Sequence, residues 1–235
     1  MSTTSASKFR FAFLCALIPM LGMVSLPSGL HVGTYALGSA KTPPSTASTK
    51  SPPAIVAFAH AWKMLKSYSV TLTIFEREGT KTQNMVFDYS FTKPSSVTTR
   101  VVEGANKGAR LTWDGGSTVV VRRGSGLLSI FKKTVSLHDP LVTTIRGSTV
   151  DQLGFGAILA HSQQPGGLSE SGGGMIDGAP TEAVTLIPTH PAYDARLTRE
   201  VIEISKKTHL PTRVLGYEGS ILVRKIDFAN IHLAF

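Results

Sequence analysis

The residues that could carry catalytic chemistry are scattered along this 235-residue sequence and form no catalytic motif. No G-x-S-x-G, H-E-x-x-H or phosphate-binding Walker pattern occurs, and Cys15 is the only cysteine. Ser125 or Ser169 would act as a nucleophile only with a nearby histidine, which the sequence cannot place. We therefore predict that the protein is not an enzyme, and we keep a serine hydrolase as a third alternative to two binding functions.

Metal-ligating residues are equally dispersed. His138 beside Asp139, or His190 with Asp194, supplies at most two ligands from a loop. Zinc sites in proteins use three or four protein ligands. We therefore predict no metal site and no cofactor.

Large apolar side chains at alternating positions indicate a different chemistry, the binding of apolar molecules. In residues 84–94 every second side chain points to the same side of an extended chain. These side chains face either a packed core under Phe58 and Trp62 or a ligand that the protein carries, and the sequence leaves both open. The four residues are Met85, Phe87, Tyr89 and Phe91.

Strand patterns fill most of residues 69–137 and return over residues 182–229. Branched and aromatic residues alternate with polar ones, and turns of a few residues, most of them with glycine, separate the runs. Parallel strands need crossovers of a dozen or more residues, so these short turns predict antiparallel neighbours. The predicted fold is α+β, with one curved antiparallel sheet of nine or ten strands.

Two helical patterns accompany the strands. The first begins with Ser51 as N-cap and Pro52 in the first turn, and its apolar stripe is Ile55, Phe58, Trp62 and Leu65.

The second helix is predicted over residues 147–162, with Ser148 or Thr149 as its cap. Two glycines in it each weaken a helix by ~1 kcal/mol relative to alanine, so it depends on what it packs against. Residues 163–180, with six glycines, are predicted to be a mobile surface loop. Helix and loop together form the predicted lid, whose apolar residues are Val150, Leu153, Ile158 and Leu159.

A trough follows from the sizes of these elements. A twisted sheet of about ten strands curls. A strand of about eight residues spans ~26 Å, whereas a helix of about fifteen residues spans ~22 Å. Two helices can therefore cross such a sheet without filling it. The predicted apolar lining consists of Phe58, Trp62, Leu65, Met85, Phe87, Tyr89, Phe91, Leu111 and Trp113.

The N-terminus predicts export. Residues 1–10 carry Lys8 and Arg10 without an acid, and residues 11–26 contain no charge, which is the layout of a secretory signal. The apolar run is short for a span of about twenty residues, and an uncleaved anchor stays the alternative. We predict a signal peptide over 1–40 with cleavage after Ala40, a Pro/Ser/Thr-rich linker over 41–53 and a folded domain over 54–235.

The charge balance is basic, with 24 Lys and Arg against 15 Asp and Glu. The signal would take two of the 24 and leave 22 basic residues. Such an excess suits an anionic envelope surface. The basic pairs, such as Arg122 with Arg123, have no aromatic residues between them, so nucleic acid is not the predicted partner.

Several segments together resemble a known superfamily. They are WKMLKSY (62–68), YSFTKP (89–94), VVEGANKGARLTWDGGSTVVV (101–121), ISKKTHLPTRVLGYEG (204–219) and IDFAN (226–230). With a signal peptide before them, they resemble the lipoprotein-localisation carriers, the LolA/LolB-like superfamily, in one of its exported branches. The resemblance covers about residues 54–233.

This resemblance implies an unclosed β-barrel of 9–11 strands with two or three covering helices. Its apolar interior would receive lipoprotein acyl chains. In the carriers a basic residue just before a strand-ending proline ties the lid shut. Lys93 holds that position here, and Arg100 is the alternative latch. Lysine offers a point charge where arginine offers a planar fork, which puts the latch in question.

The combined prediction is an exported, non-enzymatic carrier of lipids or lipoprotein acyl chains, periplasmic or secreted. A membrane-bound donor or acceptor would be its partner. The alternative is an envelope sensor or interaction module that has the same fold and a filled core.

Overall fold

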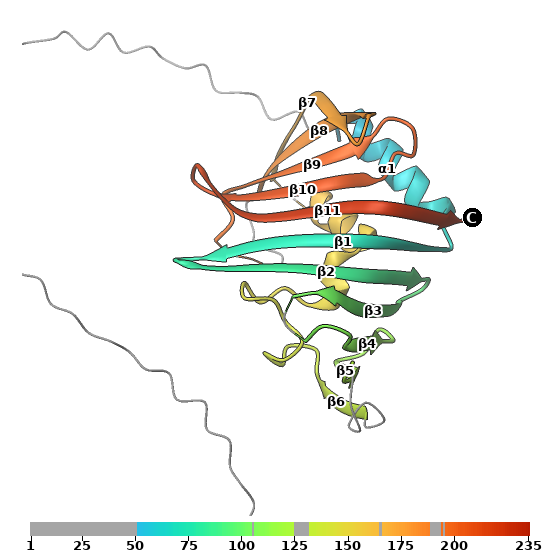
Figure 1. The fold of residues 1–235 in the computed structure, drawn as a ribbon. Helices are drawn as coiled ribbons and strands as arrows, with labels where there is room; N and C mark the ends of the chain where they lie inside the picture. Colours follow the sequence, from blue (N-terminus) through green and yellow to red (C-terminus); the bar gives the residue numbers. More distant parts are fainter. Residues whose placement is uncertain (1–50, 105, 125–131, 165, 189–193, 195) are drawn as a thin grey trace, which may run out of the picture. The chain divides into compact units, whose positions relative to one another are not determined.

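The structure is a computed structural model that describes residues 51–104, 106–124, 132–164, 166–188, 194 and 196–235. Its described strands form one antiparallel sheet in the order β6-β5-β4-β3-β2-β1-β11-β10-β9-β8-β7 (Figure 1). The strands are β1 (Ser67–Glu78), β2 (Lys81–Thr92), β3 (Ser96–Glu103), β4 (Arg110–Trp113), β5 (Thr118–Arg122), β6 (Lys132–Ser136), β7 (Gly166–Ile176), β8 (Ala179–Pro188), β9 (Arg199–Ser205), β10 (Pro211–Glu218) and β11 (Ile221–Ala234).

The sheet stays open because β6 and β7, at its two ends, are not paired with each other. Strand β1 lies in the middle of the sheet, where it pairs with β2 and β11. All the helices lie on one face (Figure 1). The predicted fold class, an unclosed antiparallel half-barrel with covering helices, is confirmed, with eleven strands.

Alternation along β1 shows which face is covered. Val70, Leu72 and Ile74 are buried, whereas Thr73 is exposed. On the neighbouring β2, Phe87 lies opposite Leu72. Side chains in register across two strands share a face, so the large residues of β2 point to the covered, inner side of the sheet.

Helix α1 (Pro53–Met64) begins one residue later than predicted from sequence, where Ser51 was the expected cap. Pro52 is its N-cap and Pro53 opens its first turn, where a missing N–H costs little. Leu65 lies just beyond the helix and is nevertheless buried.

The prediction of one helix over residues 147–162 is wrong. A 3₁₀ helix, η2 (Val150–Leu153), is followed by α2 (Phe155–Ser162), and Gly154 between them is extended. A Cβ on Gly154 would lie 2.7 Å from the Tyr89 hydroxyl oxygen and 2.8 Å from that of Tyr68. The helix is interrupted at Gly154 because two tyrosine hydroxyls of the sheet pack directly against its backbone.

The prediction of a surface loop over residues 163–180 is also wrong. Most of this segment is β7, paired with β8 from Gly166 opposite Pro188 to Ile176 opposite Ala179. A ladder bonds backbone groups, so an edge strand can form from glycines that bury little. The Glu170 carboxylate also accepts a hydrogen bond at 3.1 Å from the N–H of Ala54, in the first turn of α1.

The hydrophobic core fills the space between the helices and the middle of the sheet. Phe155 of α2 stacks on Tyr68 with ring centroids 4.4 Å apart and contacts Phe228 at 5.1 Å. Phe58 of α1 joins the same cluster and is completely buried. Among the described residues, no helix is both long and apolar enough to cross a membrane. The segments 1–40 and 41–50, predicted as signal and linker, lie outside the described residues.

Candidate functional site

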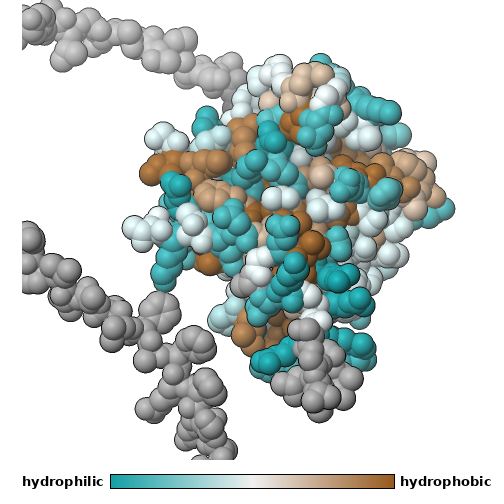
Figure 2. Space-filling view, viewed as in Figure 1, coloured by the Kyte–Doolittle hydropathy of each residue, from teal (hydrophilic) through white to brown (hydrophobic). Residues whose placement is uncertain are grey.

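A cavity of about 810 Å³ lies against strands β2 to β6, outside the filled part of the core. Ligand sites commonly have volumes of ~300–1,000 Å³. The segment 140–153, between β6 and α2, covers the cavity, and we call it the roof. Hydrophobic surface adjoins hydrophilic surface at this end of the molecule (Figure 2). Its apolar lining consists of Met85, Phe87, Val101, Ala109, Leu111, Val121, Val135, Pro140, Leu141, Val142, Val150 and Leu153.

The walls are set by strand register. Thr99 of β3 lies opposite Leu111 of β4, which lies opposite Val121 of β5. All three point inward because they share one row of the pleat. The cavity stays open because the inward residues in this wing are mostly short, whereas Phe58 and Phe155 fill the other part.

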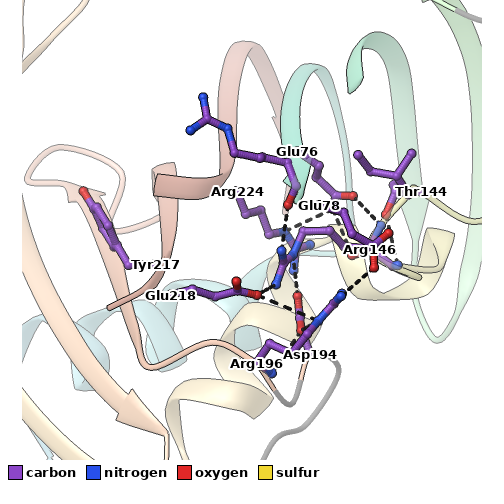
Figure 3. A network of polar contacts seen from close by, with 12 residues as sticks. Glu76, Glu78, Thr144, Arg146, Asp194, Arg196, Tyr217, Glu218 and Arg224 are labelled. Atoms are coloured by element: carbon purple, nitrogen blue, oxygen red, sulfur yellow. Dashed lines mark hydrogen bonds and ion pairs between the residues drawn. The ribbon is translucent and has the colours of Figure 1, made fainter. Parts of the chain in front are cut away.

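A buried arginine fastens the roof. The Arg146 guanidinium donates hydrogen bonds to the Asp194 carboxylate at 2.6 Å, to Glu218 at 2.5 Å and to the Arg77 carbonyl at 2.7 Å (Figure 3). Its side chain is 1% exposed. Three separate parts of the chain therefore converge on one residue of the roof.

Two further residues hold the roof to the middle of the sheet. The Glu76 carboxylate of β1, fully buried, accepts hydrogen bonds from the Arg146 N–H and the Ser148 hydroxyl, both at 3.1 Å. The Gln83 side-chain carbonyl of β2 accepts one from the Ile145 N–H at 2.9 Å. The roof is thus attached by polar side chains along one border of the cavity.

One acid and two phenols of this region, Asp194, Tyr68 and Tyr89, have displaced pKa values. Burial alone would raise the pKa of Asp194, but hydrogen bonds from Arg146 and Arg196 outweigh it and the pKa lies below its usual range. Burial raises the pKa of Tyr68 and of Tyr89. The Tyr68 oxygen accepts a hydrogen bond from the Phe155 N–H at 3.1 Å, so these neutral phenols position the start of α2.

The predicted site residues separate into two groups. Those that line the cavity are Met85, Phe87, Leu111, Val150 and Leu153. Of these, Val150 and Leu153 also belong to the hydrophobic core. The others do not line the cavity; they lie in or against the filled core and are Phe58, Trp62, Leu65, Tyr89, Phe91, Trp113, Ile158 and Leu159. A binding role for any of them stays a prediction.

Several lining residues escaped the sequence analysis. Val101, Ala109 and Val121 are short, and only their inward positions in the strand alternation could have marked them. The roof residues 140–148 lie in an irregular segment, where neither helical nor strand periodicity gives a signal.

Lys93 lies where the predicted latch should be. Its ammonium donates hydrogen bonds to the carbonyls of Trp62 at 2.5 Å and Lys63 at 3.2 Å, in the last turn of α1, and lies 4.7 Å from the centre of the Trp62 ring. A cation at a helix C-terminus is favourable. Arg100 is exposed on β3 opposite Asp88, on the outer face. The contact therefore joins the end of β2 to α1, and its role as a latch stays a prediction.

Lys93→Gln should lower the free energy of unfolding by about 0.5 to 1 kcal/mol, because an uncharged amide loses the helix-end and ring contacts. Urea denaturation at low and high salt would measure this, with a smaller loss at high salt. Arg100→Gln removes the same charge from the outer face and should cost less. Equal losses would mean that the Lys93 contacts contribute nothing specific.

Those candidate catalytic and metal residues that the structure describes form no site. Ser125 and His190 lie outside the described residues, and Ser169 is exposed on β7. Within the described ranges, no group of three or more His, Cys, Asp or Glu side chains could hold a metal ion. The absence of an enzymatic function, a metal and a cofactor stays a prediction.

The fold and cavity define an open antiparallel half-barrel with helices on its inner face and a roofed apolar cavity in one wing. No protein-family model and no curated protein matches the sequence. Solved structures similar to this chain include the lipoprotein LppX of Mycobacterium tuberculosis, with 15% identity, a TM-score of 0.44 and coverage of 77% of this chain and 91% of that one.

Two further similar structures are LprF from Mycobacterium bovis and a LolA superfamily protein from Nitrosomonas europaea. LprF has 17% identity, a TM-score of 0.43 and coverage of 77% of this chain and 93% of that one. The LolA superfamily protein has 11% identity, a TM-score of 0.35 and coverage of 77% and 94%. The fold is established by the strand order of the structure itself, and the likeness to the LolA/LolB-like superfamily stays a resemblance.

Proposed function

We propose that the protein is a non-enzymatic carrier or binder of hydrophobic ligands, lipids or lipoprotein acyl chains, in the bacterial cell envelope. The observation that carries this proposal is the roofed cavity of about 810 Å³ beside a filled core. Each buried methylene contributes ~0.8 kcal/mol, so a chain of about sixteen carbons offers ~12 kcal/mol before ordering costs. An apolar wall therefore suffices to hold such a chain.

The proposed lid is the roof segment 140–153. It contacts the cavity directly, whereas Ile158 and Leu159 of α2 pack in the core. Polar side chains fasten it along one border. Val150 and Leu153, near the end of the lid, also belong to the hydrophobic core, so the stretch before them is the part that would move to release a ligand.

The proposed location is the periplasm or the outside of the cell, after export by the signal predicted over residues 1–40, with an uncleaved anchor as the alternative. A membrane-bound donor and acceptor would load and unload the cavity. The basic excess of the chain favours approach to an anionic envelope surface.

The second candidate function is a sensor or interaction module of the envelope. One observation favours it, because the part of the sheet beneath α1 and α2 is packed solid. The cavity distinguishes the two candidates, since a sensor that works through edges or loops has no use for a ligand in it.

Val121→Trp tests the carrier function. Val121 points into the cavity from β5, and an indole there would occupy the hollow that a ligand needs. We expect affinity for a fluorescent long-chain fatty acid to fall more than tenfold, while the free energy of unfolding changes by about 1 kcal/mol or less. Fluorescence titration and urea denaturation would measure the two effects.

Val120→Trp is the matched control, because its side chain lies on the opposite face of the same strand. It should leave probe affinity unchanged. Native mass spectrometry of the full chain should also show co-purified lipid, and the Val121→Trp variant should show less. A wild-type protein that carries no lipid and binds no probe would overturn the carrier proposal and favour the sensor.

A further inference from the structure

Three basic side chains line one end of the cavity: Lys107, Arg123 and Lys133. All three are exposed, so they keep their charge at little cost. Lys107 lies in the turn before β4, Arg123 just after β5, and Lys133 near the start of β6. Three separate strand ends therefore supply the positive charge.

The fold brings these strand ends together on the inner side. Lys133 lies directly opposite Val121, which points into the cavity. The backbones at Gly108 and Gly124 touch, since a Cβ on Gly108 would lie 3.0 Å from the Gly124 Cα. This close approach places the Lys107 turn beside Gly124, the residue directly after Arg123.

The cavity is chemically asymmetric as a result. Phe87, Leu111 and Val150 give one part an apolar wall, whereas the basic residues lie at the ends of the strands. No described residue that lines it is acidic. An uncharged hydrocarbon would gain nothing from three cations, but an amphiphile with a negative headgroup would satisfy both parts at once.

We infer that the ligand is an anionic amphiphile, whose acyl chain lies along the apolar wall and whose phosphate or carboxylate headgroup lies among Lys107, Arg123 and Lys133. This inference rests on the proposed function and specifies its ligand. Exposed charges act over about a Debye length, ~8 Å at physiological salt, so the preference for an anionic headgroup weakens as salt rises.

The test compares two ligands with the same chain, palmitoyl lysophosphatidic acid and monopalmitoylglycerol, on the full-length protein below micelle-forming concentrations. The wild type should bind the anionic ligand about tenfold more tightly at low salt. The triple variant Lys107→Gln, Arg123→Gln, Lys133→Gln should lose that preference and keep its affinity for the neutral ligand. Isothermal titration calorimetry would measure all of these affinities.

A matched triple variant is available on the outer face. Arg110, Arg122 and Lys132 lie opposite one another in a row on the same strands and are exposed. Changing these three to glutamine removes an equal charge and should leave the preference intact. An equal loss in this variant would show general electrostatic attraction and overturn the inference.

Three other outcomes decide between the inference, the proposed function and membrane contact. If the wild type binds both ligands with equal affinity, the headgroup site is wrong and the apolar carrier stands. If it binds neither, the carrier proposal fails and the inference fails with it. If the inner triple variant keeps the preference but no longer binds anionic phospholipid vesicles, the cations contact a membrane surface and the inference is overturned.

Discussion

Replacing Arg146 by methionine lowers the free energy of unfolding by about 3 to 5 kcal/mol, because it removes the buried guanidinium that pairs with the buried Asp194 carboxylate. Methionine keeps much of the length of the side chain, so the loss reports on charge more than on packing. Asp194 is 3% exposed and loses a hydrogen bond of 2.6 Å, and Glu218 loses one of 2.5 Å. For a chain of this size the midpoint of thermal unfolding should fall on the order of 10 °C.

Arg196→Met is the control for this prediction. Arg196 contacts Glu78 and Asp194, but its side chain is 45% exposed, so its loss should cost about 1 kcal/mol or less. Urea denaturation of both variants gives the comparison. If the two substitutions cost the same, the Arg146 contacts behave as surface ion pairs and do not fasten the roof.

The cost of Arg146→Met should depend on pH in a defined direction. The pKa of Asp194 lies below its usual range because hydrogen bonds from Arg146 and Arg196 outweigh its burial. A carboxyl group whose pKa is lower in the folded state than in the unfolded state stabilises the fold at a pH above its unfolded-state pKa of about 3.9. This stability is lost as the pH falls through the lower pKa of the folded state. The difference between wild type and variant should therefore be largest near neutral pH and shrink in acid.

The same substitution bears on ligand exchange. Arg146 belongs to the roof and contacts β1 and β10 through Arg77 and Glu218 (Figure 3). Without it, the roof keeps its links to Glu76 and Gln83 but loses the three hydrogen bonds of the guanidinium. The roof should then open more readily, because the hydrogen bonds of the Arg146 guanidinium no longer hold it closed.

Most of the sheet could be predicted from the sequence because its strands have a local signal. Along β1 and β2 apolar and polar residues alternate, and short turns between successive strands leave antiparallel pairing as the outcome. The glycine-rich β7 has no such signal, because its place depends on pairing with β8. From the sequence, Gly154 and Gly156 are residues that weaken a helix. In the structure Gly154 lies against two tyrosine hydroxyls and Gly156 lies against the Trp62 ring, where a larger residue would not fit.

The candidate site could be predicted only in part. Met85 and Phe87 of β2 line the cavity, but Tyr89, two residues further along the same face, is buried in the core. The alternation of apolar and polar residues shows which side chains of a strand share a face of the sheet, but not which segment covers that face. Tyr89 lies under η2, with its hydroxyl donating towards the Val150 carbonyl, whereas Phe87 lies under a roof of smaller residues. The difference depends on contacts between segments sixty residues apart, which local patterns do not contain.

Phe58→Ala should lower the free energy of unfolding by about 3 to 5 kcal/mol, because Phe58 is 0% exposed in the filled core and its removal leaves a cavity with no partner atoms. Ligand affinity should be unchanged in the folded fraction of the protein, since Phe58 does not line the existing cavity. Urea denaturation and titration with the fluorescent fatty acid would measure both quantities.

Phe87→Ala, on the cavity wall, is the informative counterpart. Its ring already borders empty space, so its removal should cost less than Phe58→Ala, about 1 to 2 kcal/mol, while weakening fatty acid binding. The opposite responses of two phenylalanines would show that the sheet has a solid part that holds the fold together and a hollow part that is free to bind. Equal stability losses with no change in affinity would mean that the hollow closes in solution, and a filled sensor module would then account for the fold better than a carrier.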